Sequence, residues 1–194
     1  MTAQLFRAER LSVEPAQVCR YLGARYDRLT PELRGRVERV CAEAAELCAG
    51  QVCCLTLPLA VCAPELRFSD LLTLRSESLC RALSGCRSAV LFCATAGAAI
   101  DRRIAANRLR PSEQTLWDAA GTAAVEELCD RFCASLKTAR PRFSPGYGDL
   151  PLSCQRELLR LTDAQRLLGV GLTEALLMTP SKSVTAIVGL EEPE

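Results

Sequence analysis

Histidine is absent from this chain of 194 residues. Histidine is the commonest general base and the usual activator of Ser and Cys nucleophiles, and it supplies many of the ligands in mixed zinc sites. Its absence argues against a hydrolase that depends on a Ser–His or Cys–His pair. Acid–base chemistry in this chain would have to come from carboxylates, tyrosine, lysine or thiols.

An excess of charge of either sign is also missing. The chain has 24 Lys and Arg residues against 23 Asp and Glu residues, so there is no basic field that would attract nucleic acid. The longest uncharged run, residues 47–64, contains Gly50, Gln51 and Pro58, and we interpret it as a helix end followed by a buried strand, not a membrane span. Residues 1–15 contain no apolar core of signal-peptide length. We therefore expect a cytoplasmic protein with no membrane and no nucleic-acid partner.

No Cys-x-x-Cys pair occurs among the twelve cysteines, which removes the spacing of zinc ribbons and thioredoxin-like redox motifs. Most of the cysteines occupy apolar positions of helical or strand patterns. Cys53 and Cys54 are adjacent and Cys129 and Cys133 are one helical turn apart, but neither spacing is typical of a metal site. We expect reduced and mostly buried thiols.

The chain is long enough to bury a substantial core, and 49% of its residues are hydrophobic. Helical periodicity predicts helices near residues 14–24, 31–49, 76–83, 98–107, 113–137 and 153–168. Thr30 and Ser112 are expected to cap two of them. Extended segments are predicted near residues 52–61, 65–69, 89–95, 172–178 and 183–189.

Pro58 is expected to place its strand at a sheet edge or to split it, because proline lacks the N–H that a ladder needs. A turn at residues 180–182 is expected to join the last two strands as a hairpin, with Lys182 exposed. Strands and helices do not alternate strictly, and a hairpin implies antiparallel pairing. The predicted fold class is therefore α+β.

Residues 142–149, with the sequence RFSPGYGD, form the most distinctive segment. Taken singly, Arg142 is typical of a surface ion pair and Pro145–Gly146 of an ordinary turn. A guanidinium suited to a carboxylate or phosphate, an aromatic ring and a flexible backbone within eight residues instead favour a binding loop. Asp149 is interpreted as a turn residue.

This segment and the tail resemble the activation domain of cobalamin-dependent methionine synthase. That domain carries an Arg-x-x-Pro-Gly-Tyr motif, followed some 25 residues later by Thr-Glu, Met-x-Pro and Ser-Val. The matching residues in this chain, in the same order and at similar spacing, are Arg142, Pro145, Gly146, Tyr147, Thr173, Glu174, Met178, Pro180, Ser183 and Val184. Short bacterial proteins that consist of this domain alone are more similar still.

The resemblance implies a bent antiparallel sheet flanked by helices. It covers residues 71–194, while residues 1–70 match only loosely and are interpreted as a helical and strand-containing lobe, either separate or part of the same core. Where the family has an aromatic pair after its Ser-Val strand, this chain has Val188 and Gly189. Part of the pocket is therefore expected to differ.

The resemblance also implies a ligand, S-adenosylmethionine. Arg142 would hold its carboxylate, Tyr147 would approach its adenine, and main-chain groups at Ser144 and Gly146, beside Pro145, would contact its polar edges. Glu126 is the candidate partner for the ligand's positive groups by rough alignment, although it could equally belong to a solvated helix face. No residue is predicted to be catalytic and no metal site is predicted.

In that family the domain binds S-adenosylmethionine during reductive reactivation of cobalamin. The expected partners are a cobalamin-dependent methionine synthase or another corrinoid protein, which holds the cobalamin, and a flavodoxin-like reductant. Two alternatives remain open. The chain could cap a corrinoid enzyme without binding the ligand, or it could be an independent small-molecule methyltransferase.

Overall fold

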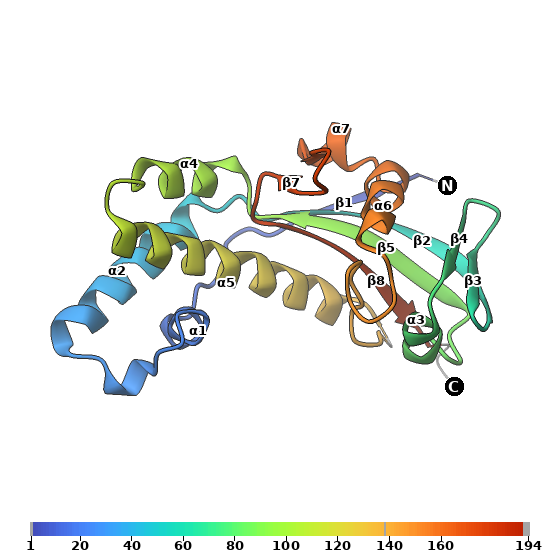
Figure 1. Ribbon diagram of the computed structural model, residues 1–194, viewed down its shortest axis with the longest axis horizontal. Helices are drawn as coiled ribbons and strands as arrows, with labels where there is room; N and C mark the ends of the chain where they lie inside the picture. The colour runs from blue at the N-terminus through green and yellow to red at the C-terminus, as the bar shows by residue number, and fades with distance from the viewer. Residues whose placement is uncertain (1, 138, 192–194) are drawn as a thin grey trace.

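The centre of the molecule is an antiparallel sheet of six strands (Figure 1). A computed structural model describes residues 2–137 and 139–191; Thr138 and the end of the tail, residues 192–194, lie outside the described residues. The strand order is β4-β3-β2-β5-β8, and β1 pairs with β2. The strands are β1 (Gln4–Arg7), β2 (Gln51–Cys62), β3 (Glu65–Phe68), β4 (Leu72–Arg75), β5 (Ser88–Thr95) and β8 (Ser183–Leu190). The sheet curls, and helices flank it, so the predicted α+β class and bent sheet are confirmed.

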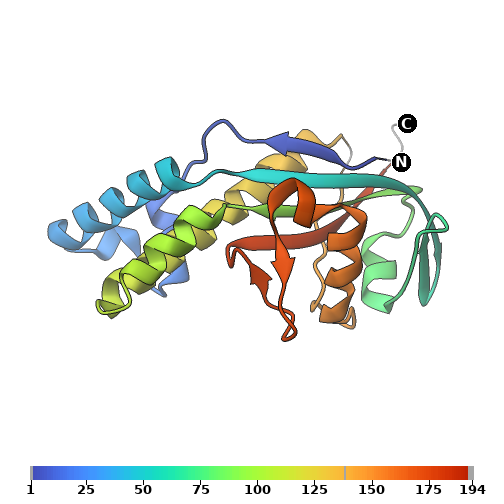
Figure 2. The same cartoon turned by 90° about the horizontal axis from the view of Figure 1, so that it is seen from above.

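Helices cover both faces of this sheet. The long α5 packs under β5 and β8 and is itself contacted by α1, α2 and α4, whereas α6 and α7 lie on the opposite face against β5, β8 and β2 (Figures 1 and 2). The helices are α1 (Pro15–Tyr21), α2 (Pro31–Leu47), α3 (Glu77–Ala82), α4 (Ala98–Ala106), α5 (Pro111–Ser135), α6 (Gln155–Leu161) and α7 (Ala164–Leu168). Short 3-10 turns occupy Tyr26–Arg28 and Leu152–Cys154, and a two-stranded ribbon pairs β6 (Gly171–Leu172) with β7 (Met178–Thr179).

The strand β5 shows how the sheet separates two cores. Its side chains alternate between the faces: Val90 and Phe92 pack in the core with α5, while Leu91 packs in the core that includes α3 and α6. Nearly every residue of β5 is buried, as expected for a strand covered on both faces. The wholly apolar run AVLFCAT was the sequence signal for this position.

The strand β2 is central, so the prediction that Pro58 marks an edge or a break was wrong. The strand is continuous over 12 residues and pairs with β5 along one side. On its other side β1 pairs with residues 51–54 and β3 with residues 59–62. Pro58 lies between these two partners, where no neighbour needs its missing N–H. The first 70 residues thus share one sheet with the rest of the chain.

The predicted hairpin in the tail was also wrong. Strand β8 pairs with β5 over eight positions, from Ser183 opposite Thr95 to Leu190 opposite Ser88, and residues 172–178 form only the ends of the β6–β7 ribbon. The backbone N–H and the hydroxyl of Ser181 donate to the Asp101 carboxylate at 2.6 and 2.8 Å, which holds the turn before β8 against α4. Antiparallel pairing remains, but with a different partner.

Several local predictions can be compared directly with the structure. Thr30 caps α2 as predicted, accepting the Leu33 N–H at 3.4 Å, whereas Ser112 lies inside α5 and accepts from Arg36 at 2.9 Å. The predicted helix at 153–168 is interrupted at Asp163, whose φ is +54°. Lys182 is not exposed: its side chain is 12% accessible and pairs with Asp118 at 2.8 Å. Within the described residues no helix is both long and apolar enough to cross a membrane.

Candidate functional site

Residues 139–143, which we call the edge segment, follow α5 and run antiparallel along the outer edge of β8. The Phe143 N–H donates to the Ile187 carbonyl at 2.9 Å, and the Ile187 N–H returns a bond of 2.8 Å to the Phe143 carbonyl. The Arg140 N–H donates to the Gly189 carbonyl at 2.8 Å. These backbone bonds fix the position of Arg142 between α5 and the sheet.

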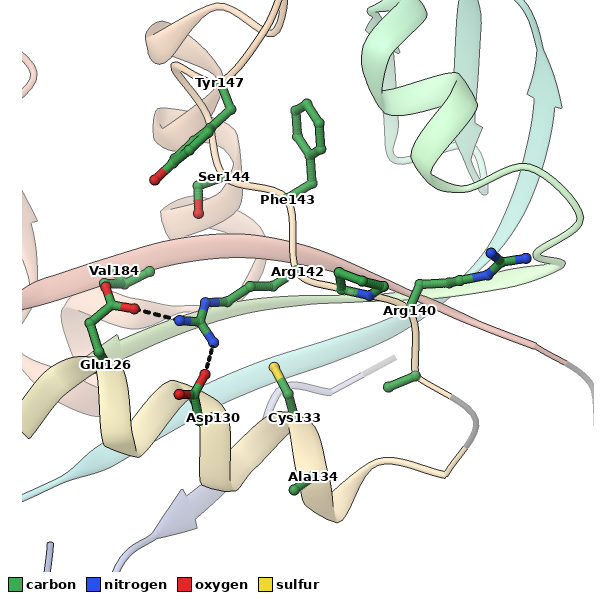
Figure 3. A pocket seen from close by; sticks show the side chains of 12 residues that line it. Glu126, Asp130, Cys133, Ala134, Arg140, Arg142, Phe143, Ser144, Tyr147 and Val184 are labelled. Atoms are coloured by element: carbon green, nitrogen blue, oxygen red, sulfur yellow. Dashed lines mark hydrogen bonds and ion pairs between the residues drawn. The ribbon is translucent and has the colours of Figure 1, made fainter. Parts of the chain in front are cut away.

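A cavity of about 680 Å³ lies between the edge segment, the second half of α5 and the start of β8 (Figure 3). Four of the six predicted binding residues line it: Glu126, Arg142, Ser144 and Tyr147. The remaining lining residues are Asp130, Cys133, Ala134, Ala139, Arg140, Pro141, Phe143 and Val184. Residues far apart in the sequence therefore meet at one site, as the prediction for Glu126 requires.

Arg142 forms ion pairs with two carboxylates of α5. One terminal nitrogen (Nη2) pairs with Glu126 and the other (Nη1) with Asp130, as the dashed lines in Figure 3 show. The accessible fractions of these side chains are 23% for Arg142, 33% for Glu126 and 68% for Asp130. Burial disfavours the charge, but the hydrogen bond to Asp130 and the surrounding negative charge more than offset it, so the pKa of Arg142 is raised. The guanidinium stays charged.

Two aromatic rings stand on the side of the cavity away from α5. Tyr147 is 67% accessible and its ring meets that of Phe143 edge-on, with 6.4 Å between the ring centroids. The Ser144 side chain lies between these rings and Arg142, and Arg140 points away from Arg142 toward its partner Glu191 (Figure 3). The cavity thus has a charged wall and an aromatic wall.

Pro145 and Gly146 shape the turn and are not among the residues that line the cavity. Pro145 is buried. Gly146 has a φ of +90°, which favours glycine, and its N–H donates to the Leu150 carbonyl at 2.9 Å. This N–H is therefore used within the turn and is not free to contact a ligand.

Asp149 has a larger structural role than that of a simple turn residue. Its carboxylate accepts the Ser76 hydroxyl at 2.6 Å and the backbone N–H groups of Glu77 and Ser78 at 2.7 and 3.0 Å. The bond from Ser76, together with these N–H groups, holds the pKa of Asp149 well below its usual range. Asp149 thus fastens the loop of residues 142–149 to the first turn of α3.

All twelve cysteines are free, and only Cys62 is classed as exposed. Cys133 lines the cavity, where burial raises the pKa of its thiol while Arg142 opposes that rise. Burial also raises the pKa of Cys129, to about 12. Among the described residues no group of three His, Cys, Asp or Glu side chains is placed to hold a metal ion.

Asp130 and Phe143 were missed as binding candidates in the sequence. Asp130 follows Glu126 by four residues and so shares its helix face, a signal that was available. Phe143 lies within the RFSPGYGD segment but at a position that the Arg-x-x-Pro-Gly-Tyr motif leaves unspecified. Val188 and Gly189 are buried and do not line the cavity, and a Cβ at Gly189 would lie 2.6 Å from the Cys86 sulfur. The aromatic wall therefore comes from the loop.

The fold can be compared with solved structures. A crystal structure of the MetH reactivation domain bound to AdoHcy matches this chain with a TM-score of 0.68, covering 100% of this chain and 80% of that one. This chain has the fold of the MetH reactivation domain. The two sequences are 12% identical, so the likeness concerns the fold.

Comparisons by sequence gave no further relative. No protein-family model matches the chain, and no curated protein matches it. The resemblance to the activation domain that the motifs indicated is supported by the fold alone, over the full length of this chain.

Proposed function

We propose that this protein binds S-adenosylmethionine and supports the reductive reactivation of cobalamin held by a partner protein. The observation that carries the proposal is the cavity in which Arg142 and Glu126 face Tyr147, within a fold whose solved counterpart is bound to AdoHcy. AdoHcy is S-adenosylhomocysteine, the product that remains when S-adenosylmethionine gives up its methyl group. Both ligands carry an adenine, a carboxylate and an ammonium.

The residues of the cavity fit these groups. A volume of about 680 Å³ lies within the usual range for small-ligand pockets. Arg142 can hold a carboxylate through charge-assisted N–H bonds, and the Glu126 carboxylate can face the ammonium or the sulfonium. Tyr147 and Phe143 offer flat apolar faces to an adenine. No residue of the cavity is an evident nucleophile apart from Cys133, whose raised pKa keeps it protonated at neutral pH.

The contribution of this chain is then to bind and to orient. S-adenosylmethionine supplies a methyl group made electrophilic by its sulfonium. Fixing the amino-acid end at Arg142 and the adenine at Tyr147 defines where that methyl can lie, which lowers the entropic cost of transfer to an acceptor. The acceptor would be the cobalt of a cobalamin on a methionine synthase or another corrinoid protein, with an electron from a flavodoxin-like donor.

Titration of the purified protein with S-adenosylmethionine by calorimetry tests the binding step. Arg142→Ala should weaken binding by about tenfold or more, because hydrogen bonds to charged groups are worth about 1.5–3 kcal/mol. Arg160→Ala is a matched control, since Arg160 pairs with Glu157 on α6 and does not line the cavity. Absence of binding to the wild-type protein, or equal affinity for all three proteins, would overturn the proposal.

Two measurements, binding of S-adenosylmethionine and capture of a corrinoid protein, distinguish the remaining alternatives. A capping protein would bind a corrinoid protein without binding S-adenosylmethionine. An independent methyltransferase would bind S-adenosylmethionine but capture no corrinoid protein. Reactivation of an oxidised methionine synthase that depends on added protein, S-adenosylmethionine and reductant would support the proposed function alone.

A further inference from the structure

The two acidic partners of Arg142 are not equivalent. Both belong to α5 and lie one helical turn apart, yet Glu126 is 33% accessible and Asp130 is 68% accessible. Both line the same cavity as Arg142 itself. One terminal nitrogen of the guanidinium is thus bound by the half-buried Glu126, and the other by Asp130, which faces solvent.

The cost of separating each pair from Arg142 follows from this difference. An exposed ion pair contributes about 0–1 kcal/mol, since water replaces the lost partner at little cost. Separating Glu126 would leave a partly desolvated carboxylate without its cation, which costs more. A ligand that needs the guanidinium will therefore displace Asp130 first and leave Glu126 in place.

Asp130 also has the same chemistry as the group that would displace it. The Asp130 carboxylate binds Nη1 of Arg142. The carboxylate of an amino-acid ligand would bind the same kind of N–H donor. We propose that Asp130 is an internal competitor that occupies Arg142 until a ligand carboxylate replaces it. This inference rests on the proposed function, and it assigns Asp130 a role in setting the affinity for ligands that carry a carboxylate.

Displacement of Asp130 is compensated only when a ligand carboxylate takes its place on Arg142. A ligand with a carboxylate and an ammonium exchanges one Arg142 pair for another and gains a partner for its ammonium in Glu126. A cationic ligand without a carboxylate cannot replace the negative charge that Asp130 places beside Arg142. Such a ligand would bind with the Arg142–Asp130 pair intact. Loss of the Asp130 charge should therefore tighten the binding of ligands that carry a carboxylate, and not the binding of a decarboxylated ligand.

The test is a comparison of dissociation constants by calorimetry at constant salt for wild type and Asp130→Asn. S-adenosylmethionine and S-adenosylhomocysteine should bind roughly two- to fivefold more tightly to Asp130→Asn, the range expected for loss of a competing exposed pair. Decarboxylated S-adenosylmethionine should bind no more tightly to the variant. Glu127→Gln is the matched control: it removes one negative charge from the same helix, but Glu127 pairs with Arg131 and does not line the cavity.

Each outcome decides the question. Equal or weaker binding of S-adenosylmethionine to Asp130→Asn would overturn the competition while leaving the proposed function standing. Equal tightening by Glu127→Gln would assign the effect to the general field of the helix and would also overturn it. Failure of both wild type and Asp130→Asn to bind either ligand would overturn the proposed function together with this inference.

Discussion

Single carboxylates hold the loops of this protein to its helices. Asp101, in the first turn of α4, binds the turn before β8, and Asp149 binds the start of α3 from the loop that carries Arg142 and Tyr147. In both cases a charged acceptor satisfies an N–H group that the local backbone leaves unpaired. The position of the candidate binding loop therefore depends on one side chain outside the cavity.

Replacement of Asp149 by Asn should destabilise the protein in a pH-dependent way. The lowered pKa of Asp149 in the folded state means that its contribution is present above the unfolded value near about 4 and is lost as the pH falls through the lower, folded value. The difference in free energy of unfolding between wild type and Asp149→Asn should therefore be constant near neutral pH and shrink below pH 4. Urea unfolding at a series of pH values measures this difference, and a gap that stays constant or grows in acid would contradict the assignment.

The cysteines should differ sharply in reactivity. Cys62 is exposed, whereas burial raises the pKa of the half-buried thiols Cys48, Cys133 and Cys154. Because the thiolate is the reactive form, we expect a single rapidly alkylated thiol when the native protein meets iodoacetamide near pH 8. Mass spectrometry should locate the label on Cys62, and Cys62→Ser should lose the fast phase. A second thiol labelled equally fast would show that the core opens readily.

At the scale of elements, the helices and strands of the sequence prediction are largely those of the structure, because hydrophobic periodicity is a local property. The errors came from residues whose neighbours are distant. Pro58 can lie in a central strand because β1 and β3, which pair along the same side of β2, leave the residues between them outside either ladder. Strand β8 pairs with β5, some 90 residues earlier in the chain, and not with residues 172–178. Lys182 is partly buried because α5 supplies its partner Asp118, which no local pattern reveals.

The surroundings of two glycines, Gly189 in β8 and Gly35 in α2, predict opposite effects for the same substitution to alanine. A Cβ at Gly189 would lie 2.6 Å from the Cys86 sulfur and 2.8 Å from a Leu83 methyl carbon, and both side chains are buried. Gly189→Ala should cost about 1–3 kcal/mol of unfolding free energy through overpacking. Gly35→Ala, in α2 with open space around its Cα, should instead stabilise by about 0.5–1 kcal/mol through helix propensity. Chemical denaturation compares the two, and a neutral Gly189→Ala would show that the turn between α3 and β5 yields at this contact.

At the scale of the whole molecule, the candidate site is assembled by the fold. Arg142, Ser144 and Tyr147 could be selected from the sequence because the motif places them within six residues. The partners of Arg142 on α5 are 12 and 16 residues before it, and only the path of the edge segment along β8 brings them together. Glu126 was reached through a family resemblance, whereas the competing role that we propose for Asp130 required the geometry.

The shared sheet also predicts that the chain unfolds as one unit. The segment that resembles the activation domain begins near residue 71, but its strand β5 pairs along eight positions with β2, which belongs to the first 70 residues. A fragment of residues 71–194 would therefore expose a long unpaired edge of β5 and one face of its core, and we expect it to be unfolded or aggregated. The full chain should show a single calorimetric transition with equal calorimetric and van't Hoff enthalpies. Two resolved transitions, or cooperative unfolding of the isolated fragment, would instead indicate that the first 70 residues form a separate lobe.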